Sequence, residues 1–361
     1  MNYAATDFDV AVIGAGMSAL TCARQLQHAG YRVVILEKSR GVGGRVATRR
    51  LHGTLADHGT CYLTPKGEAF RSLLQPMIAT GVLTVWTDTV HELGADGTLH
   101  AADANPRFIA PDGMTAIAKF LARDLDIRLS HVVKTIAQGD DGHWQVTCQH
   151  TAPDQTMTTV TLSAGAIVVA IPAPQAAMLL QTLPVGVLPD AFLQQVQSVT
   201  FTPCLSVIAG YAVDRRQEWL SQYPNVCSVT FTKDGNLAWL GDDSSKRKDA
   251  PQPVFVVQST AAFAEQYLDA ISLQSAGYTL LKRAAERLQA AWLATPDWLQ
   301  VHRWRYAFAR SPLADPDLSA ETAAPLVCAG DWCGGQKVEQ AFLSGLAAAA
   351  SIDRQLQAQA K

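Results

Sequence analysis

The chain has 361 residues, which at roughly 150 residues per domain suggests two domains, or one domain with a second inserted into it. Hydrophobic residues make up 48% and charged residues 17%, which excludes a disordered or fibrous chain. The formal net charge of -3 provides no overall attraction for nucleic acid or an anionic membrane, so any anion site must be local.

The seven cysteines are scattered and form no CxxC pair. An odd number without close spacing is typical of reduced thiols, so we expect a cytoplasmic protein without disulfides and without a metal site. Residues 1–9 contain two aspartates and no basic residue, which is not the pattern of a secretory signal or a transit peptide.

The first predicted elements form a strand, glycine turn, helix and strand unit. Phe8–Ile13 is apolar and rich in β-formers, Gly14-Ala15-Gly16 follows, and a helical pattern over 20–28 precedes a second strand over 32–36. Gly14 permits a tight turn, and the missing side chain at Gly16 lets a pyrophosphate approach the backbone. The residue after the second strand, Glu37, can bind a ribose diol. This unit predicts dinucleotide binding; the alternative is a structural turn in an ordinary α/β unit.

A basic, glycine-rich stretch follows directly. Residues 38–50 contain five basic residues and no acidic one, with glycines at 41, 43 and 44. Backbone N–H groups in such a loop can converge on an anion, and Arg45 can donate two hydrogen bonds to phosphate oxygens. The stretch therefore indicates a diphosphate site, with a solvated loop as the alternative.

The middle of the chain supplies further elements. We predict a helix over 111–122, strands over 127–136 and 144–148 with a turn at 139–142, a buried strand over 166–171, an exposed charged loop over 242–249 and a helix over 273–293. Between residues 155 and 213 the only charged side chain is Asp190. Prolines and glycines interrupt this span, and it offers no run of about 20 helical apolar residues, so we expect buried strands and turns. A peripheral membrane contact is the alternative.

The last elements have the same order as the first, a strand, a glycine-rich turn and a helix. An apolar strand over 326–329 leads into Gly330-Asp331, a glycine-rich turn and a helix that begins at Val338. A helix N-terminus stabilises negative charge, and Asp331 can bind a polyol.

Together, Gly14-Ala15-Gly16, Glu37 to Arg45 and Gly330-Asp331 resemble the flavin-binding signature of the FAD-dependent amine oxidase superfamily. A finer similarity, to its bacterial renalase-like branch, rests on seven stretches: 38–45, 113–117, 172–175, 302–307, 330–333, 338–339 and 343–345. These stretches span nearly the whole chain.

The resemblance implies an α/β fold. A discontinuous Rossmann-like FAD-binding domain would comprise residues 1–65, 127–180 and 321–361, and an inserted α+β substrate domain with a mixed or antiparallel sheet would comprise 66–126 and 181–320. FAD would be bound non-covalently, because neither Cys61 nor Cys333 lies where the family carries a linking cysteine.

The resemblance also implies an activity. The enzyme would transfer hydride from 2- or 6-dihydronicotinamide isomers of NAD(P) to the flavin, regenerate the oxidised coenzyme and reduce dioxygen to hydrogen peroxide. Its partners would be this dinucleotide and dioxygen, with no nucleic acid, membrane or obligate protein partner. Three alternatives stay open: a flavin amine oxidase, a polyene desaturase-like oxidoreductase, and an FAD-binding redox sensor that uses Cys61 and turns over little.

Motif positions give the expected contacts. The FAD contacts would be Gly14, Ala15, Gly16, Ser18, Glu37, Lys38, Arg45, Cys61, Tyr62, Val133, Asp331 and Val338. The substrate cavity would be lined by Tyr62, Leu63, Thr64, Phe108, Ile109, Ala110 and Trp332. No acid–base catalyst is assigned, because restored aromaticity in the nicotinamide drives hydride transfer.

Four positions in this region need comment. His58, next to Asp57, is either a general base or a hydrogen-bonded histidine near the cofactor. Cys61 stands where the family usually has glutamine, Phe108 where tryptophan is expected, and Gln340 where a glycine is usual. These departures bear on the substrate reaction more than on the FAD fold.

Overall fold

A computed structural model describes residues 7–359 of the chain, which divide into two compact units. Unit 1 combines three separate segments, 7–44, 118–201 and 308–359, and unit 2 combines residues 45–117 and 202–307.

The core of unit 1 is a parallel sheet that follows the predicted strand, turn, helix and strand pattern. Its strands are β1 (Phe8–Ile13), β2 (Val33–Leu36), β9 (Asp126–Arg128), β12 (Met157–Val169) and β19 (Leu326–Cys328). The parallel pairs place them in the spatial order β9–β2–β1–β12–β19. The chain extends the sheet first on one side of β1 and then on the other, which is the Rossmann arrangement, and ligands bind at the carboxyl ends where the order reverses. Three antiparallel strands complete the sheet: β10 (His131–Gln138), β11 (Trp144–Thr151) and β18 (Leu318–Ala320).

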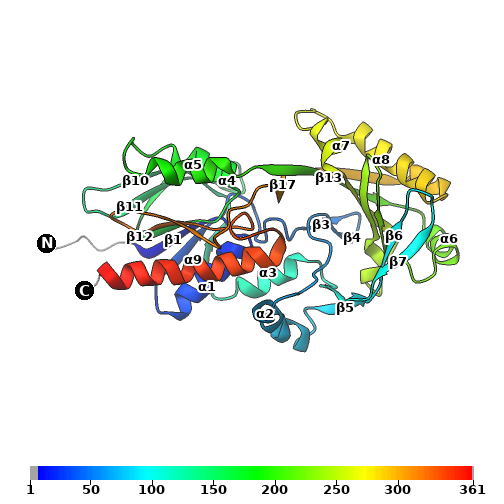
Figure 1. The fold of residues 1–361 in the computed structure, drawn as a ribbon, viewed down its shortest axis with the longest axis horizontal. Helices are drawn as coiled ribbons and strands as arrows, with labels where there is room; N and C mark the ends of the chain where they lie inside the picture. Colours follow the sequence, from blue (N-terminus) through cyan, green and yellow to red (C-terminus); the bar gives the residue numbers. More distant parts are fainter. Residues whose placement is uncertain (1–6, 360–361) are drawn as a thin grey trace. The chain divides into compact units, whose positions relative to one another are not determined.

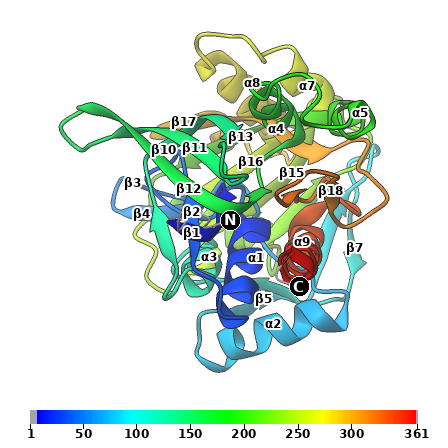
Figure 2. The same ribbon diagram turned by 90° about the vertical axis from the view of Figure 1, so that its left-hand side faces the viewer.

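Two helices of unit 1 lie side by side and begin near the same edge of this sheet (Figures 1 and 2). They are α1 (Met17–His28), which follows β1, and α9 (Lys337–Gln359), which follows β19. Gly345 of α9 permits the close packing, because a Cβ there would lie 2.4 Å from the carbonyl oxygen of Ser18. Two further helices, α4 (Ala173–Leu180) and α5 (Asp190–Ser198), also belong to this unit.

Unit 2 is built on a seven-stranded mixed sheet with the order β17–β13–β16–β15–β14–β6–β7. The strands are β6 (Val90–Leu93), β7 (Leu99–Asp103), β13 (Phe201–Gly210), β14 (Ser228–Phe231), β15 (Leu237–Asp242), β16 (Val254–Ser259) and β17 (Trp298–Ala309). Two strand pairs accompany it: β3 (Thr48–Leu51) with β4 (Thr54–Asp57), and β5 (Thr84–Thr87) with β8 (Arg107–Ile109). The helices are α2 (Glu68–Ala79), α3 (Thr115–Leu121), which crosses the boundary between the units, α6 (Arg215–Gln222), α7 (Ala261–Glu265), α8 (Gln274–Arg287) and the short 3-10 helices η1 (Asp243–Lys246) and η2 (Ala291–Ala294).

Each face of the seven-stranded sheet has its own apolar cluster. On one face α8 lies against the sheet (Figure 1). Its Leu280 and Leu281 belong to a core that includes Phe255 of β16. The second cluster joins Ala56 and Cys61, from β4 and the segment after it, to Ile208, Trp239, Val254 and Val256 of the sheet.

The unit boundaries differ from the predicted domain boundaries. Residues 45–65 belong to unit 2 because Ala56 and Cys61 are buried in that second cluster. Residues 118–126, 181–201 and 308–320 belong to unit 1, where Phe192 and Ala309 lie in the core. The sequence placed these stretches differently because a boundary depends on which sheet a segment packs against.

Several predicted elements also need correction. The segment 242–249 is not an exposed loop, because Asp242, Asp243, Ser244 and Lys246 are all buried. The helix predicted over 273–293 ends at Arg287, since Gln289 adopts a positive φ of 49°.

Two further stretches differ in part. The strand predicted over 127–136 is interrupted at Ser130, where φ is 57°. The nearly uncharged span 155–213 contains the helices α4 and α5 as well as strands, and Met178 and Val185 are exposed there. Between residues 7 and 359, no helix has the length and apolar character needed to cross a membrane.

Candidate functional site

The glycine turn after β1 has the geometry that a dinucleotide site requires. Gly14 adopts a φ of 102°, and a Cβ there would lie 2.7 Å from the carbonyl oxygen of Ala170. Gly16 is different, because its φ is -79° and a Cβ there would meet nothing within 4 Å. Gly14 therefore serves the fold, whereas Gly16 leaves open space at the N-terminus of α1.

Glu37 ties this turn to the loop that follows β2. Its Oε2 accepts a 2.8 Å hydrogen bond from the main-chain N–H of Ala15, and its Oε1 accepts another of 2.8 Å from Ser39. The N–H of Gly43 also donates to the carbonyl of Ala15 at 2.8 Å. The carboxylate thus orders both predicted phosphate-binding segments, and a ribose contact would use its remaining lone pairs.

Ser18 supplies an unused donor in the same place. It is the second residue of α1, its side chain is buried, and its Oγ has no hydrogen-bond partner within the described part of the chain. The first N–H groups of a helix also lack partners inside the helix. Unsatisfied donors and an open glycine position form a set that suits pyrophosphate oxygens. Of the other predicted contacts in unit 1, Lys38 is exposed and Val133 packs half-buried against the core.

The turn before α9 contains the remaining predicted cofactor contacts of unit 1. Asp331 is 5% exposed, and Val338 is half-buried at the second position of α9. The N–H of Gly330 donates to Oγ of Ser344 at 2.9 Å, which anchors this turn to the helix.

Trp332 does not line a cavity, contrary to the prediction. Its side chain has 0% exposure and belongs to the core of unit 1. The indole N–H donates to the carbonyl of Ile171 at 3.0 Å. The ring also occupies the space that a Cβ at Gly330 would need, 2.4 Å from Nε1. Trp332 is therefore a packing residue.

The other predicted cavity residues come together in unit 2. The N–H of Leu63 donates to the carbonyl of Phe108 at 2.8 Å, and the N–H of Phe108 donates back at 2.9 Å. Along the segment the side chains alternate, with Tyr62 and Thr64 half-buried on either side of the buried Leu63. Phe108, which lies opposite Leu63 in the bridge, is also half-buried. Leu63, Ile109 and Ala110 are 3%, 1% and 0% exposed, so they support the segment and do not line a cavity.

Tyr62 lies in an aromatic group. Its ring centroid is 6.3 Å from that of Trp86 and 6.1 Å from that of Trp239, and the guanidinium carbon of Arg107 lies 5.6 Å from it. Rings at these separations contribute apolar area and defined orientation. Tyr62 is thus held as a flat, partly accessible surface.

Two stretches that carry the finer resemblance are bonded to each other in unit 2. Nη1 of Arg45 donates to the carbonyl oxygens of Ala307 at 3.1 Å and of Tyr306 at 3.4 Å. Nε1 of Trp304 donates to the carbonyl of His58 at 2.8 Å. One guanidinium nitrogen of Arg45 is thereby committed to main-chain oxygens, where the sequence predicted phosphate.

His58 is stacked on Trp304, with ring centroids 5.2 Å apart. Burial, with contributions from His302 and Arg49, lowers the pKa of His58 to about 3. Its Nδ1 has no hydrogen-bond partner among the described residues. His58 is therefore neutral at neutral pH and a weak base.

Sequence reasoning missed a buried charge cluster, which consists of Asp57, Asp243, Lys246 and Arg247. Nζ of Lys246 lies 2.6 Å from Asp243 and 3.1 Å from Asp57, and all three side chains have 0% exposure. The guanidinium of Arg247 lies 2.6 Å from Asp243 and 3.2 Å from Asp57. The only signal in the sequence was the high density of charged residues over 242–249. It predicted an exposed loop, because Asp57, which pairs with Lys246 and Arg247, is remote in the chain.

The cluster fixes the charge of Asp57. Burial alone would raise the pKa of its carboxyl group, but the Lys246 ammonium, the Arg247 guanidinium and hydrogen bonds from Thr48 and Met114 outweigh burial and lower it. Burial by itself would lower the pKa of Lys246, and the two carboxylates raise it instead. Asp57 and Lys246 are thus held as an ion pair.

Cys61 lies beside this cluster. Its Sγ donates to the carbonyl of Asp57 at 3.1 Å, and Nε2 of Gln258 lies 3.5 Å from Sγ. Burial raises the pKa of the Cys61 thiol, so it stays protonated. A buried thiol is unsuited to a thioether link or to redox sensing, because both need an accessible thiolate.

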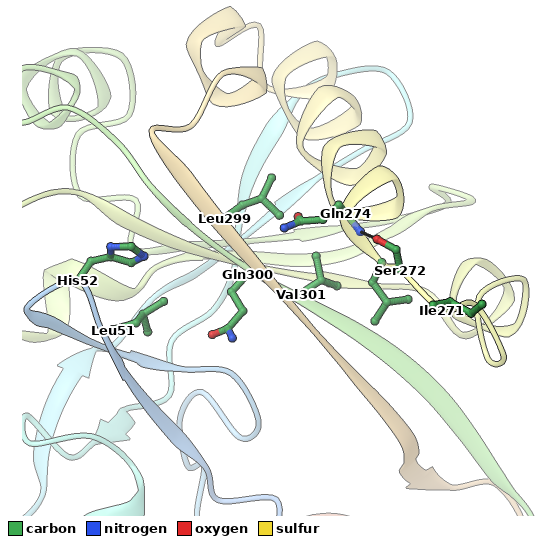
Figure 3. A pocket seen from close by; sticks show the side chains of 9 residues that line it. Leu51, His52, Ile271, Ser272, Gln274, Leu299, Gln300 and Val301 are labelled. Carbon is green, nitrogen blue, oxygen red and sulfur yellow. Dashed lines mark hydrogen bonds between the residues drawn. The ribbon is translucent and has the colours of Figure 1, made fainter.

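Unit 2 also has an open surface pocket of about 520 Å³ (Figure 3). It is lined by Leu51, His52, Ile271, Ser272, Leu273, Gln274, Leu299, Gln300 and Val301, which come from β3 and its turn, the start of α8, and β17. None of the predicted site residues lines it.

The fold and the turn geometry define a dinucleotide-binding α/β protein, and comparison with known proteins narrows the class. A family model described as an NAD(P)-binding Rossmann-like domain matches residues 12–76, and one described as flavin containing amine oxidoreductase matches residues 80–353. The chain therefore belongs to the flavin-containing amine oxidoreductase family, with FAD as its cofactor. The open position at Gly16 and the unsatisfied Ser18 hydroxyl fit this cofactor.

Curated relatives match only short stretches. A Mycobacterium tuberculosis protein described as a flavin-containing monoamine oxidase is 40% identical over 65 residues, which are 18% of this chain and 14% of that protein. An L-amino-acid oxidase of Siganus canaliculatus is 41% identical over 68 residues, 18% of this chain and 13% of that protein. The chain thus covers a small part of the length of either relative.

Solved structures share the fold over nearly the whole chain. A putrescine oxidase bound to putrescine has a TM-score of 0.69 at 15% identity, covering 96% of this chain and 99% of the other. An Exiguobacterium protein described as a protoporphyrinogen oxidase has a TM-score of 0.71 at 13% identity, with 98% and 100% covered.

Proposed function

We propose that this protein is a renalase-like oxidase that takes hydride from 2- or 6-dihydronicotinamide isomers of NAD(P) and releases the oxidised coenzyme. The proposal refines the family's FAD-dependent chemistry, with dioxygen as the acceptor and hydrogen peroxide as the product. Oxidation of an amine is the alternative that the family membership supports equally.

The observation that carries the proposal is the state of the titratable groups beside the segment Tyr62–Thr64. Asp57 is paired with two cations, His58 is a weak base, and the Cys61 thiol is protonated. Each of these three groups is therefore unsuited to removing a proton from a substrate near neutral pH.

A dihydronicotinamide suits such surroundings, because it loses a hydride and becomes aromatic without losing a proton to the protein. An alkylamine has a pKa of about 10, so it arrives protonated and must lose that proton before it can give a hydride. The chemistry of this segment thus favours the dihydronicotinamide.

The chain's own residues would hold and orient the reactants. FAD, when bound, accepts the hydride and passes the electrons to dioxygen. The open position at Gly16 and the Ser18 hydroxyl would hold its pyrophosphate. The half-buried rings of Tyr62 and Phe108 offer flat apolar faces against which a nicotinamide can stack.

The test is an anaerobic reduction. The FAD-loaded protein is mixed with borohydride-reduced NAD, which contains the 2- and 6-dihydro isomers, and the flavin absorbance is followed. We expect rapid bleaching, then recovery of absorbance with release of hydrogen peroxide when air is admitted. Ordinary NADH and putrescine are the comparison substrates.

The other outcomes each identify a different function. Bleaching by putrescine or another amine, but not by the isomers, would replace the proposal with an amine oxidase. Bleaching only by an apolar polyene would indicate a desaturase-like enzyme. A flavin that stays oxidised with every donor would indicate an FAD-binding protein with little turnover.

A further inference from the structure

The ammonium of Lys246 holds the main chain just before the predicted substrate-contacting segment. Nζ donates to the carbonyl oxygen of Cys61 at 2.7 Å, to Asp243 at 2.6 Å and to Asp57 at 3.1 Å. An ammonium has three donors, so Lys246 uses all of them inside the protein.

Asp57 connects Lys246 to two other elements. Its Oδ1 accepts hydrogen bonds from the Thr48 hydroxyl of β3 at 2.7 Å and from the N–H of Met114, just before α3, at 2.8 Å. Its main-chain carbonyl accepts the thiol of Cys61 at 3.1 Å. The buried charge cluster therefore fixes the turn 57–61 at both ends.

The segment Tyr62–Thr64 follows this turn directly, so the position of the turn sets the position of the segment. Leu63 pairs with Phe108, so the half-buried rings on both sides of the bridge take their positions from the same backbone. A shift of the Cys61 carbonyl would move Tyr62 and, through the bridge, Phe108.

We propose that Lys246 is a positioning residue for the segment Tyr62–Thr64, acting through the carbonyl of Cys61 and the carboxylates of Asp57 and Asp243. The inference rests on the proposed function only in taking these residues as substrate contacts. Lys246 touches no reacting atom and is not a catalytic residue.

The test uses a double variant that removes one charge of each sign. Lys246→Met with Asp243→Asn leaves Asp57 paired with Arg247 and frees the Cys61 carbonyl, so it avoids an unpaired buried carboxylate. The matched control is Asp234→Asn with Arg283→Met, which removes an ion pair of 2.9 Å elsewhere in unit 2.

Two measurements follow on the FAD-loaded proteins. The first is alkylation of Cys61 under native conditions, quantified by mass spectrometry against Cys328, which is buried in unit 1. Loss of a charge-assisted hydrogen bond should raise the rate at Cys61 about tenfold in the double variant and leave Cys328 unchanged. The second is steady-state kinetics with the reduced isomers, where KM should rise about tenfold with kcat nearly constant.

The outcomes separate the two proposals. If the wild type does not oxidise the isomers, the proposed function fails, and Cys61 alkylation still decides whether Lys246 holds this segment. Alkylation of Cys61 at the wild-type rate in the double variant would overturn the inference. If the wild type does oxidise the isomers, an unchanged KM in the double variant would overturn it too. If the double variant does not fold, Lys246→Arg keeps the charge but alters the donor geometry, and the same Cys61 measurement applies.

Discussion

The main-chain N–H of Ala15 lies 2.8 Å from Oε2 of Glu37, a contact that joins the glycine turn to a residue 22 positions later in the chain. Because Oε1 of the same carboxylate binds Ser39, both oxygens are used by N–H donors. A carboxylate satisfies two such donors, whereas an amide side chain has one oxygen and would present its own N–H to the other.

Replacing Glu37 by glutamine should therefore disorder the turn and its loop together. We expect FAD affinity to fall about tenfold or more, since a lost charge-assisted hydrogen bond costs about 1.5–3 kcal/mol. The measurement is a titration of apoprotein with FAD, followed by flavin fluorescence. Glu265→Gln, at an exposed position, is the control. Equal affinities in Glu37→Gln and wild type would show that the turn orders itself without this carboxylate.

Gly14 and Gly16 should respond differently to alanine. Gly14→Ala places a Cβ 2.7 Å from the carbonyl oxygen of Ala170 at a φ of 102°, so it should destabilise the apoprotein, by roughly 1–3 kcal/mol or more from the backbone strain alone. Gly16→Ala meets nothing within 4 Å, so the apoprotein should keep its stability and lose FAD affinity. Denaturant unfolding of both apoproteins and FAD titration check this pair. A Gly16→Ala protein with wild-type FAD affinity would contradict the placement of the pyrophosphate.

The sequence predicts the dinucleotide turn well because its signals are local. The strand, Gly14, Gly16 and Glu37 lie within one short stretch, and each residue type has a physical reason to stand there. The parallel pairing of β1 with β2 then follows, because the helix between them is a crossover connection.

The buried charge cluster is not predictable in the same way. Lys246 and Asp57 lie 189 positions apart in the chain. A run of charged residues is usually exposed, and it is buried only when its charges are paired, so the burial of Lys246 cannot be predicted before its partner is known. The cavity residues show a related limit. Their motif positions do not reveal that Leu63 bonds to Phe108, or that Leu63 is buried while Tyr62 and Thr64 beside it are half-buried.

Trp332 should behave as a core residue. Replacing it by phenylalanine leaves the carbonyl of Ile171 without its donor and removes buried volume, so the free energy of unfolding should fall by about 1–3 kcal/mol or more. The KM for substrate should stay at the wild-type value. Chemical denaturation and steady-state kinetics provide the comparison. Unchanged stability with a raised KM would show that Trp332 lines the substrate cavity after all.

His58 should make the protein sensitive to acid. Its pKa is lowered from 6.5 to about 3 in the folded state, so the unfolded chain binds the proton more readily below 6.5. Stability is therefore complete above the unfolded pKa and falls as the pH falls. His58→Phe keeps an aromatic ring beside Trp304 and removes the titrating group.

Between about pH 6.5 and 4.5, the wild type should lose about 2 kcal/mol that the His58→Phe variant retains. Urea unfolding of both proteins across this range measures the difference. Parallel pH curves for the two proteins would show that His58 is not buried in its neutral form.

Asp242 should give the opposite dependence. Burial raises its pKa from 3.8 to about 6, although hydrogen bonds from Ser244 and Ser245 act against that rise. A raised folded pKa means that the folded protein binds the proton more tightly than the unfolded chain. The stability contribution of Asp242 is therefore present below 3.8 and lost as the pH rises through about 6.

Asp242→Asn keeps an acceptor for both serines and carries no charge at any pH. The free energy of unfolding of the wild type, relative to this variant, should fall by about 2 kcal/mol between about pH 4.5 and 7. The exposed Asp249→Asn, in the same segment, is the control and should run parallel to the wild type. A constant difference between wild type and Asp242→Asn over this range would mean that Asp242 stays ionised in the folded protein, with water or a cation reaching it.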